Sequence, residues 1–315
     1  MKAIVQDRYG LADVLALREI GKPTPGHGEV LIKVRGSSVN YGDHVMMTGQ
    51  PYASRLVLGF QRPKHAVLGM DVAGIVEAVG AGATRFKVGD AVYGEANRTY
   101  AEYVCVSERR LAYKPANMSF EMSAAFPVAA ITALQGLRDK AGVKPGDKVL
   151  INGASGGVGT FAVQIARAFG AEVTAVCSTR NVDMVRALGA AHVVDYTQED
   201  FSQTSARYDA IFDLVGTASI GACRRILAPG GVYVSSVGRM GWSLKSLLAS
   251  FIPGPGKVVL FAAKPTAADL DVLRHMAEAG QIEPVIDRRY TLSEVPSAMR
   301  AQGQGHARGK SIIVL

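Results

Sequence analysis

Glycines at regular spacing follow a short apolar run near the middle of the chain. Gly153, Gly156 and Gly159 have the spacing G-x-x-G-x-x-G, directly after the β-branched run 149–151, and a helical apolar pattern then continues to Gly170. In a strand, glycine turn and helix, small residues let a phosphate approach the backbone, and the positive helix end attracts the anion. The pattern, a variant of the dinucleotide fingerprint, predicts a pyrophosphate site. Its residues are Gly153, Ala154, Ser155, Gly156, Gly157, Val158 and Gly159.

A second strand, expected at 172–177, completes a βαβ unit and ends where a dinucleotide site selects its ribose. The residues there are Cys177, Ser178, Thr179, Arg180 and Asn181, and this end carries no carboxylate. An NAD site places an acidic residue at this point to bind the 2′-OH. Hydroxyls and a guanidinium suit a 2′-phosphate instead, because arginine donates charge-assisted, fork-shaped hydrogen bonds. We therefore expect NADPH. The alternative is a solvated loop arginine beside serine and threonine helix caps.

Two regions of different character can position these residues. Residues 1–122 show strand-like alternation, with strands expected at 2–6, 14–19, 29–36, 72–79, 91–93 and 101–106. We expect a short helical turn at 40–48 and a loop at 52–65. Beyond 122, strands and helices alternate, which predicts a parallel sheet. A helix at 123–137 leads into it, and strands are expected at 149–151, 192–195, 208–214, 232–237 and 258–262, with helices at 182–188 and 220–227.

The C-terminal tail completes the first region. A helix at 267–279 and a strand at 311–315 are expected there. The sequence thus predicts an α/β fold with a domain at 1–122, completed by 264–315, and a nucleotide domain at 123–263. A chain that leaves and re-enters one domain is expected to place its ligand near the carboxyl ends of the parallel strands. The apolar stretch 239–256 is interpreted as a lid over a hydrophobic acceptor or as a dimer or core segment.

Composition excludes several other classes of protein. The 315 residues include 48% hydrophobic residues and carry a formal net charge of +8, with basic residues scattered and not in runs. We therefore expect no nucleic-acid binding, and a basic surface helps recruit a polyanionic cofactor. The three cysteines form no C-x-x-C pair, so no disulfide scaffold or zinc lobe is expected. No apolar run has spanning length and the N-terminus lacks a signal-peptide pattern, which predicts a cytoplasmic protein without membrane attachment.

Several sequence blocks in a fixed order resemble the medium-chain dehydrogenase/reductase superfamily, in its zinc-independent, quinone-oxidoreductase-like branch. They are SVNYGD at 38–43, GMDVAGIV at 69–76, FKVGDAVYG at 86–94, YAEY at 100–103, the glycine turn, and GK at 309–310. The resemblance implies a Rossmann-type domain, a GroES-like domain and a homodimer formed through the strands at 232–237 and 258–262. Zinc-using members look similar but have Cys where Asn40 stands and His-Glu where Met70-Asp71 stand. Asn and Met do not replace a thiolate and an imidazole at zinc, so no metal is expected.

The resemblance also implies roles for individual residues. Asn40 and Thr132 are expected beside the nicotinamide, with Tyr41 and Tyr52 as candidate donors to the developing oxyanion, or else as ordinary packing residues. Tyr196 and Lys310 are expected around the 2′-phosphate, unless they are surface residues without a partner. The remaining expected cofactor contacts are Gly216, Ser236, Val237, Gly238, Phe261, Ala263 and Lys264.

The function expected is an NADPH-dependent reduction of a small hydrophobic, electron-poor substrate, a quinone or an α,β-unsaturated carbonyl. Hydride transfer builds negative charge on the conjugated oxygen, which hydrogen-bond donors stabilise. No proton donor is identified, and bulk water can deliver the proton. Two alternatives remain at this point: an enoyl-thioester reductase, and a non-catalytic NADPH-binding sensor or scaffold.

Overall fold

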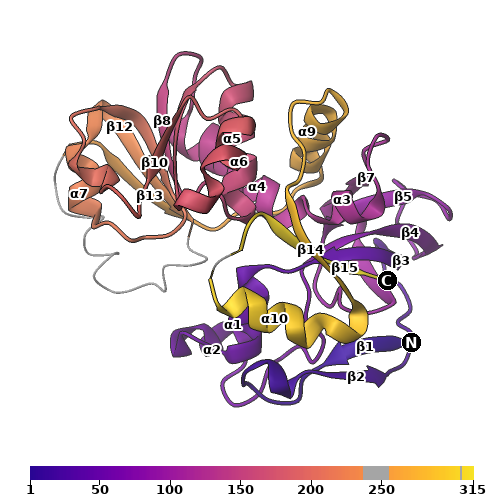
Figure 1. Cartoon of the computed structure of the whole chain (residues 1–315). Coiled ribbons are helices and arrows are strands. Elements are labelled where there is room, and N and C mark those ends of the chain that lie inside the picture. Colours follow the sequence, from indigo (N-terminus) through magenta and orange to yellow (C-terminus); the bar gives the residue numbers. More distant parts are fainter. Residues whose placement is uncertain (237–254, 306) are drawn as a thin grey trace. The chain divides into compact units, whose positions relative to one another are not determined.

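The chain divides into two compact units in a computed structural model that describes residues 1–236, 255–305 and 307–315 (Figure 1). The first unit contains Met1–Ile131 and Pro265–Leu315, and the second contains Thr132–Lys264. The expected helix at 123–137 crosses this boundary, so its first half belongs to the first unit. The predicted α/β fold class, with a parallel Rossmann-type sheet, is confirmed.

The second unit is built on a six-stranded sheet in which every neighbouring pair is parallel. Its order is β10-β9-β8-β11-β12-β13, the doubly wound order of a dinucleotide-binding fold. The strands are β8 (Lys148–Asn152), β9 (Glu172–Cys177), β10 (His192–Asp195), β11 (Tyr208–Asp213), β12 (Leu227–Ser236) and β13 (Lys257–Phe261). Because all six run in the same direction, their carboxyl ends lie at one edge of the sheet.

Helices cover both faces of this sheet. Figure 1 shows α5 (Gly157–Ala168) and α6 (Val182–Ala187) on one side and α7 (Ile220–Arg225) on the other. The apolar spacing of α5 buries Phe161 and Ile165 completely, and α7 packs Ile220 and Cys223 into a cluster with Leu150 of β8. Short 3-10 turns follow β9 at Thr179–Asn181 and precede β11 at Phe201–Gln203.

The expected helix at 123–137 is wrong as one continuous element. The structure has α3 (Phe120–Ala124), then α4 (Pro127–Gln135), and then a wide π turn at Gly136–Ala141. Pro127 has no N–H and so cannot bond back into a preceding turn, but it fits the first position of a new helix. The break at Pro127 puts the N-terminus of α4 next to a buried carboxylate described below.

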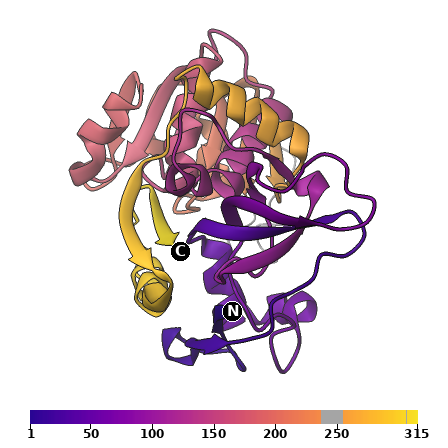
Figure 2. The ribbon, with the colours of Figure 1, turned by 90° about the vertical axis from the view of Figure 1, so that its right-hand side faces the viewer.

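The first unit contains a seven-stranded sheet and a two-stranded sheet. The larger sheet has the order β14-β15-β3-β4-β5-β7, with β6 also paired to β3. Its strands are β3 (Glu29–Ser38), β4 (Asp71–Val79), β5 (Ala91–Glu95), β6 (Tyr103–Ser107), β7 (Leu111–Tyr113), β14 (Ile286–Thr291) and β15 (Lys310–Val314). The smaller sheet pairs β1 (Lys2–Val5) with β2 (Ala16–Glu19). Figure 2 shows the C-terminal strand, drawn in yellow, ending beside the N-terminal part of the same unit.

Helices and turns of the first unit surround this sheet. They are α1 (Tyr41–Thr48), α2 (Arg55–Leu58), α9 (Ala267–Glu278), α10 (Val295–Gly303) and the 3-10 turns Ala12–Val14, Tyr52–Ser54, Glu108–Arg110 and Leu292–Glu294. Met47 of α1 packs with Val295 and Met299 of α10 in one buried cluster. The sequence analysis missed β7, β14 and α10, and it predicted a loop where α2 lies. These elements are short or polar, so their periodicity is weak.

None of the helices in the described residues has the length and apolar content needed to cross a membrane. The three cysteines are free thiols, and Cys177 and Cys223 are buried. Burial raises the pKa of the Cys177 thiol to about 11, so at neutral pH it is protonated.

Candidate functional site

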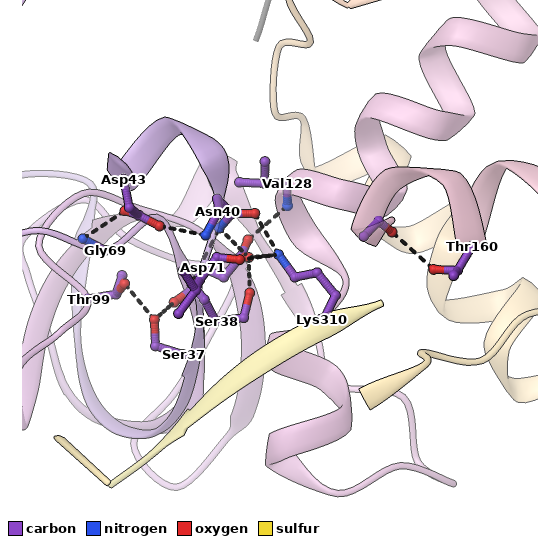
Figure 3. A network of polar contacts seen from close by, with 12 residues as sticks. Ser37, Ser38, Asn40, Asp43, Gly69, Asp71, Thr99, Val128, Thr160 and Lys310 are labelled. Atoms are coloured by element: carbon purple, nitrogen blue, oxygen red, sulfur yellow. Dashed lines mark hydrogen bonds and ion pairs between the residues drawn. The ribbon is translucent and has the colours of Figure 1, made fainter. Parts of the chain in front are cut away.

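Asn40 lies where β3 ends and α1 begins, and almost all of it is buried, with 6% of its surface exposed (Figure 3). Its backbone N–H donates to Asp43 Oδ2 at 2.9 Å, which closes the first turn of α1. Its side-chain Nδ2 donates to Asp71 Oδ2 at 2.8 Å and to the Ser38 carbonyl oxygen at 3.3 Å. The Oδ1 atom accepts from Lys310 Nζ at 2.6 Å. All polar groups of this predicted site residue are therefore fixed by neighbours.

Asp71, the first residue of β4, connects three elements through one carboxylate that is fully buried. Its Oδ2 atom accepts from the Ser38 hydroxyl and from Asn40. Its Oδ1 atom accepts the Val128 N–H at 2.8 Å, in the first turn of α4. A carboxylate at that point satisfies an N–H that has no partner within the helix and favours the positive end of the helix dipole.

Lys310 belongs to the same buried polar cluster as Asn40 and Asp71. Its ammonium is 3% exposed and lies within the first unit, where Asn40 Oδ1, the Val39 carbonyl at 3.2 Å and Asp71 Oδ2 at 3.3 Å surround it. The three hydrogens of the ammonium thus have three oxygen acceptors within this cluster, and these contacts do not support the predicted contact with a 2′-phosphate, which stays a prediction. The overlooked signal was the presence of charged residues in apolar strands, because a buried charge must have a partner.

Asp43 is a second buried carboxyl group next to Asn40. Besides the Asn40 N–H, it accepts from the Gly69 N–H at 3.1 Å and from the Tyr100 hydroxyl at 3.0 Å. Burial raises the pKa of Asp43 to about 7, although the three donors favour its ionised form. Asp43 thus joins α1 to the segment that leads into β4.

The two candidate tyrosines have different surroundings. Tyr41, directly after Asn40, stacks with His44, and the ring centroids are 6.1 Å apart. Tyr52 is 70% exposed, and the centre of its ring lies 4.8 Å from the Arg55 guanidinium, which also lies 4.4 Å from the centre of the Tyr9 ring. The apolar side chains of Leu56, Val57 and Phe60, close to Tyr52 in the sequence, are also exposed. Neither hydroxyl is fixed among the buried polar groups around Asn40, so both donor roles stay predictions.

The glycine turn of the second unit forms as expected between β8 and α5. Gly153 has a φ of +85°, and Gly156 precedes the first residue of α5. The N–H groups of Gly153 and Ala154 both donate to the Val176 carbonyl, and the Gly156 N–H donates to the Gly153 carbonyl. The first amides of α5, at Gly157 and Val158, lack acceptors within the helix and are the ones suited to an anion.

Two serine hydroxyls lie next to this turn. The Asn181 side-chain Nδ2 donates to Ser155 Oγ at 3.1 Å and to Ser178 Oγ at 3.2 Å, which ties the turn to the end of β9. A hydroxyl that accepts from an amide keeps its own hydrogen free for an acceptor. Ser155 and Ser178 therefore each keep a hydroxyl hydrogen to donate, and Asn181, which is 3% exposed, holds both hydroxyls in position.

A carboxylate lies closer to the predicted 2′-phosphate site than the sequence suggested. Asp195, at the end of β10, pairs in register with Cys177 at the end of β9. It accepts from the Thr179 hydroxyl at 2.6 Å and from the Thr197 hydroxyl and N–H, and these bonds, that of Thr179 foremost, lower the Asp195 pKa. The Thr179 hydroxyl hydrogen is thus engaged by Asp195, and the contacts of Ser178 and Arg180 with a 2′-phosphate stay predictions. The side chain of Tyr196 is exposed, and its backbone N–H donates to the carbonyl of Cys177 at the end of β9.

The other expected cofactor residues follow the remaining strand ends. Asp213, at the end of β11, accepts from the N–H groups of Val215 and Gly216 at 3.0 and 2.8 Å and from the Tyr233 hydroxyl at 2.8 Å. These bonds hold the Gly216 loop in position.

Ser236 pairs in register with Phe261, where β12 and β13 end. The side-chain Nε2 of Gln135 donates to the Lys264 carbonyl at 2.7 Å, and its Oε1 accepts from the Lys264 N–H at 3.0 Å. Ala263 directly precedes Lys264. Thr132 is buried in α4. The predicted contacts Val237 and Gly238, and residues 239–254 of the expected lid, lie outside the described residues.

Residues 1–236, 255–305 and 307–315 contain no group of three or more His, Cys, Asp or Glu side chains that could hold a metal ion.

Comparison with known proteins gives a consistent result. Residues 26–116 match the alcohol dehydrogenase GroES-like domain family, and residues 188–313 match the zinc-binding dehydrogenase family. The chain is 32% identical to 2-methylene-furan-3-one reductase of Solanum lycopersicum, over 99% of this chain and 79% of that protein. It is 31% identical to NADPH-dependent alkenal/one oxidoreductase of Arabidopsis thaliana, with the same two coverages. The quinone oxidoreductase from Coxiella burnetii has a similar structure, with a TM-score of 0.89, 30% identity, and coverage of 100% of this chain and 99% of that one.

Proposed function

We propose a specific activity for this chain, which belongs to the medium-chain dehydrogenase/reductase superfamily and to its quinone-oxidoreductase-like branch. The activity is NADPH-dependent hydride transfer to a quinone or to the activated C=C bond of an α,β-unsaturated carbonyl compound. The similarity to reductases of enones, alkenals and quinones supports this function. The observation that supports the choice of cofactor is that Asn181 holds the hydroxyls of Ser155 and Ser178 beside the glycine turn. Ser178 lies one residue before Thr179 and two before Arg180 at the end of β9, where no carboxylate occurs in the local sequence.

The residues of the second unit fit a dinucleotide. The first amides of α5 would hold the pyrophosphate, and Ser178, Arg180 and Tyr196 would surround the 2′-phosphate. Asp195 binds Thr179 and Thr197, so its negative charge is partly compensated by these donors. The Gly216 loop and residues 261–264 would contact the cofactor. Asp213 fixes the Gly216 loop, and Gln135 fixes the backbone at Lys264.

NADPH supplies the hydride, and the protein's task is to stabilise the negative charge that develops on the acceptor oxygen. Asn40 is the proposed donor, because its Nδ2 carries one hydrogen in a long, 3.3 Å bond to the Ser38 carbonyl that a better acceptor can displace. Thr132 is proposed to contact the nicotinamide ring of the cofactor. Tyr41 and Tyr52 remain the candidates for protonation, together with bulk water.

We propose that the reaction uses no zinc. A divalent metal needs a set of deprotonated or lone-pair donors that all face it. Here Asn40 Oδ1 and Asp71 Oδ2 face the ammonium of Lys310, at 2.6 and 3.3 Å, so a cation of the protein itself already lies between them. The residues therefore do not fit a metal ion in that position.

Purified protein treated with a chelator tests the proposal. NADPH oxidation, followed by loss of the reduced nicotinamide absorbance, should depend on the acceptor across a panel of quinones, enones and alkenals, and added zinc should not increase it. Crotonyl-CoA in the same panel tests the enoyl-thioester alternative. Tight NADPH binding without turnover of any acceptor would contradict the enzymatic function and favour a sensor or scaffold.

We also propose a homodimer formed through β13, the edge strand of the parallel sheet as far as the structure describes it. Light scattering should give twice the 33.3 kDa of one chain, and a mass of one chain would refute it. A cytoplasmic location stays a prediction that cell fractionation tests.

A further inference from the structure

Lys310 is a buried cation with no direct place in the proposed hydride transfer. Its ammonium is surrounded by a side-chain amide oxygen, a backbone carbonyl and a carboxylate (Figure 3). Burying an ammonium and ordering a lysine side chain both cost free energy, and apolar residues of similar volume often replace buried ion pairs without loss of stability. Stability alone is therefore a weak explanation for a lysine at this position.

The sheet register brings the lysine to Asn40. Strands β15 and β3 are antiparallel, with Ile312 opposite Ser38, and the Val39 N–H donates to the Ser311 carbonyl. Continuing this register by two residues places Lys310 opposite Asn40. The contact between them, 2.6 Å from Nζ to Oδ1, is the shortest that the ammonium makes.

The two charges together permit a single orientation of the Asn40 amide. Its oxygen faces the ammonium of Lys310, and its nitrogen faces the carboxylate of Asp71. A rotation by half a turn would point N–H groups at an ammonium and an oxygen at a carboxylate, and both contacts would be repulsive. The other oxygen of Asp71 accepts the Val128 N–H, which fixes the carboxylate, so Asp71 cannot rearrange to suit a rotated Asn40 amide.

We propose that Lys310 is a positioning residue, which acts on the reaction by fixing and polarising the side-chain amide of Asn40. This inference rests on the proposed function, in which Asn40 Nδ2 donates to the acceptor oxygen. A cation on the amide oxygen draws electron density from the nitrogen and makes its N–H a stronger donor. The ammonium does not touch the reactants, since its three hydrogens are used within the cluster.

A double-mutant cycle between Lys310 and Asn40 tests the proposal. Lys310→Met removes the charge with a side chain only one atom shorter, and it should lower kcat by about 10- to 100-fold, with KM for the acceptor nearly unchanged, as expected for a misplaced catalytic group. Asn40→Ala should lower kcat by a similar factor, and the double variant should be no slower than Asn40→Ala alone. Lys33→Met, at an exposed position of β3, is the matched control and should keep full activity. Losses that multiply in the double variant would overturn the proposal.

A second variant covers the case in which Lys310→Met leaves Asp71 unpaired and prevents folding. Asp71→Asn combined with Lys310→Met removes both charges, and its thermal unfolding shows whether the unit is intact. If this folded, neutral pair had wild-type kcat, the charges would have no role in positioning and the proposal would fail.

A measurement that needs no turnover separates this inference from the function it rests on. The side-chain NH₂ resonances of Asn40, identified by their loss in Asn40→Ala, should shift and lose protection from solvent exchange in Lys310→Met but not in Lys33→Met. Unchanged resonances would overturn the positioning role. If wild-type protein reduced none of the acceptors while these resonances shifted, the proposed function would fail and the contact that orients Asn40 would stand.

Discussion

Gly156 and Gly159 offer a matched test of the pyrophosphate site, because an alanine meets different surroundings at each. A Cβ on Gly159 would lie 2.1 Å from the Gly153 carbonyl oxygen and 2.7 Å from backbone atoms of Ala154. A Cβ on Gly156 would have the Gly153 carbonyl oxygen as its nearest neighbour, at an ordinary 3.5 Å, and the backbone there has a φ of −81° that any residue adopts. The structure thus requires glycine at 159, whereas at 156 only a ligand would require it.

The expected magnitudes follow from these distances. Gly159→Ala should cost about 1–3 kcal/mol of unfolding free energy, since the methyl group forces backbone atoms apart. Gly156→Ala should stay within about 0.5 kcal/mol of wild type, because the entropy gained by removing a glycine offsets a slightly poorer helix cap. If the pyrophosphate lies against Gly156, the added methyl should weaken NADPH binding by about tenfold or more, which is about 1.4 kcal/mol.

Urea unfolding with and without NADPH gives both values in one experiment. At an NADPH concentration 100 times the wild-type Kd, the ligand should stabilise wild type by about 2.7 kcal/mol, and a variant that binds tenfold more weakly by about 1.4 kcal/mol. Nicotinamide fluorescence titration provides the independent Kd. A Gly156→Ala protein that binds NADPH as tightly as wild type would refute the placement of the pyrophosphate, whatever its stability.

Two further perturbations test the second unit. Arg180→Glu should raise the Kd for NADPH relative to that for NADH by tenfold or more, because a carboxylate repels the 2′-phosphate, whereas Arg186→Glu, at an exposed position of α6, should leave the ratio unchanged; an unaltered ratio in Arg180→Glu would mean that the phosphate lies elsewhere. Tyr233→Phe should destabilise the fold by about 1–3 kcal/mol in urea, because Asp213 Oδ2 loses a buried donor at 2.8 Å, and a stability equal to wild type would contradict that role.

The sequence predicted the regular parts of both units because their periodicity is strong. The parallel strands, α5 and the glycine turn combine apolar runs with glycine and proline punctuation, and the structure has them at nearly the expected positions. Strand β14 was missed because half of its sequence, IDRRYT, is charged and most of it is exposed. The break between α3 and α4 was missed because the apolar pattern continues through Pro127 even though the hydrogen bonding does not.

The polar groups around Asn40 show what a pattern along the chain cannot reveal. Asn40, Asp71 and Lys310 come from three strands or strand ends that are far apart in the sequence, and only the sheet register brings them together. The same holds for Asp195, which reaches Thr179 from the neighbouring strand and adds a carboxylate where the local sequence has none. Charged residues inside apolar strands were the available hint, but they do not identify their partners.

The buried carboxyl of Asp43 makes a pH-dependent contribution to stability whose sign can be worked out. Its native pKa is raised to about 7, mainly by burial, whereas an unfolded aspartate titrates near 4. Between those values the native state binds a proton that the unfolded state has released, so this group favours folding at low pH and its contribution is lost as the pH rises through 7. The slope is about 1.4 kcal/mol per pH unit within that window.

Other buried groups also make the stability depend on pH, so a variant is needed to isolate the contribution of Asp43. Burial lowers the pKa of His44, so the contribution of His44 to stability rises with pH. Burial raises the pKa of Glu95 to about 7, so the contribution of Glu95 falls with pH, as that of Asp43 does. Asp43→Asn does not titrate and keeps the shape of the side chain, so the unfolding free energy of wild type minus that of this variant should fall from about pH 5 to about pH 7 and level off above pH 7. Glu95→Gln, measured in the same way, separates the second carboxyl group. Parallel stability curves for wild type and Asp43→Asn across this range would mean that Asp43 stays ionised, held by the N–H groups of Asn40 and Gly69 and the Tyr100 hydroxyl despite its burial.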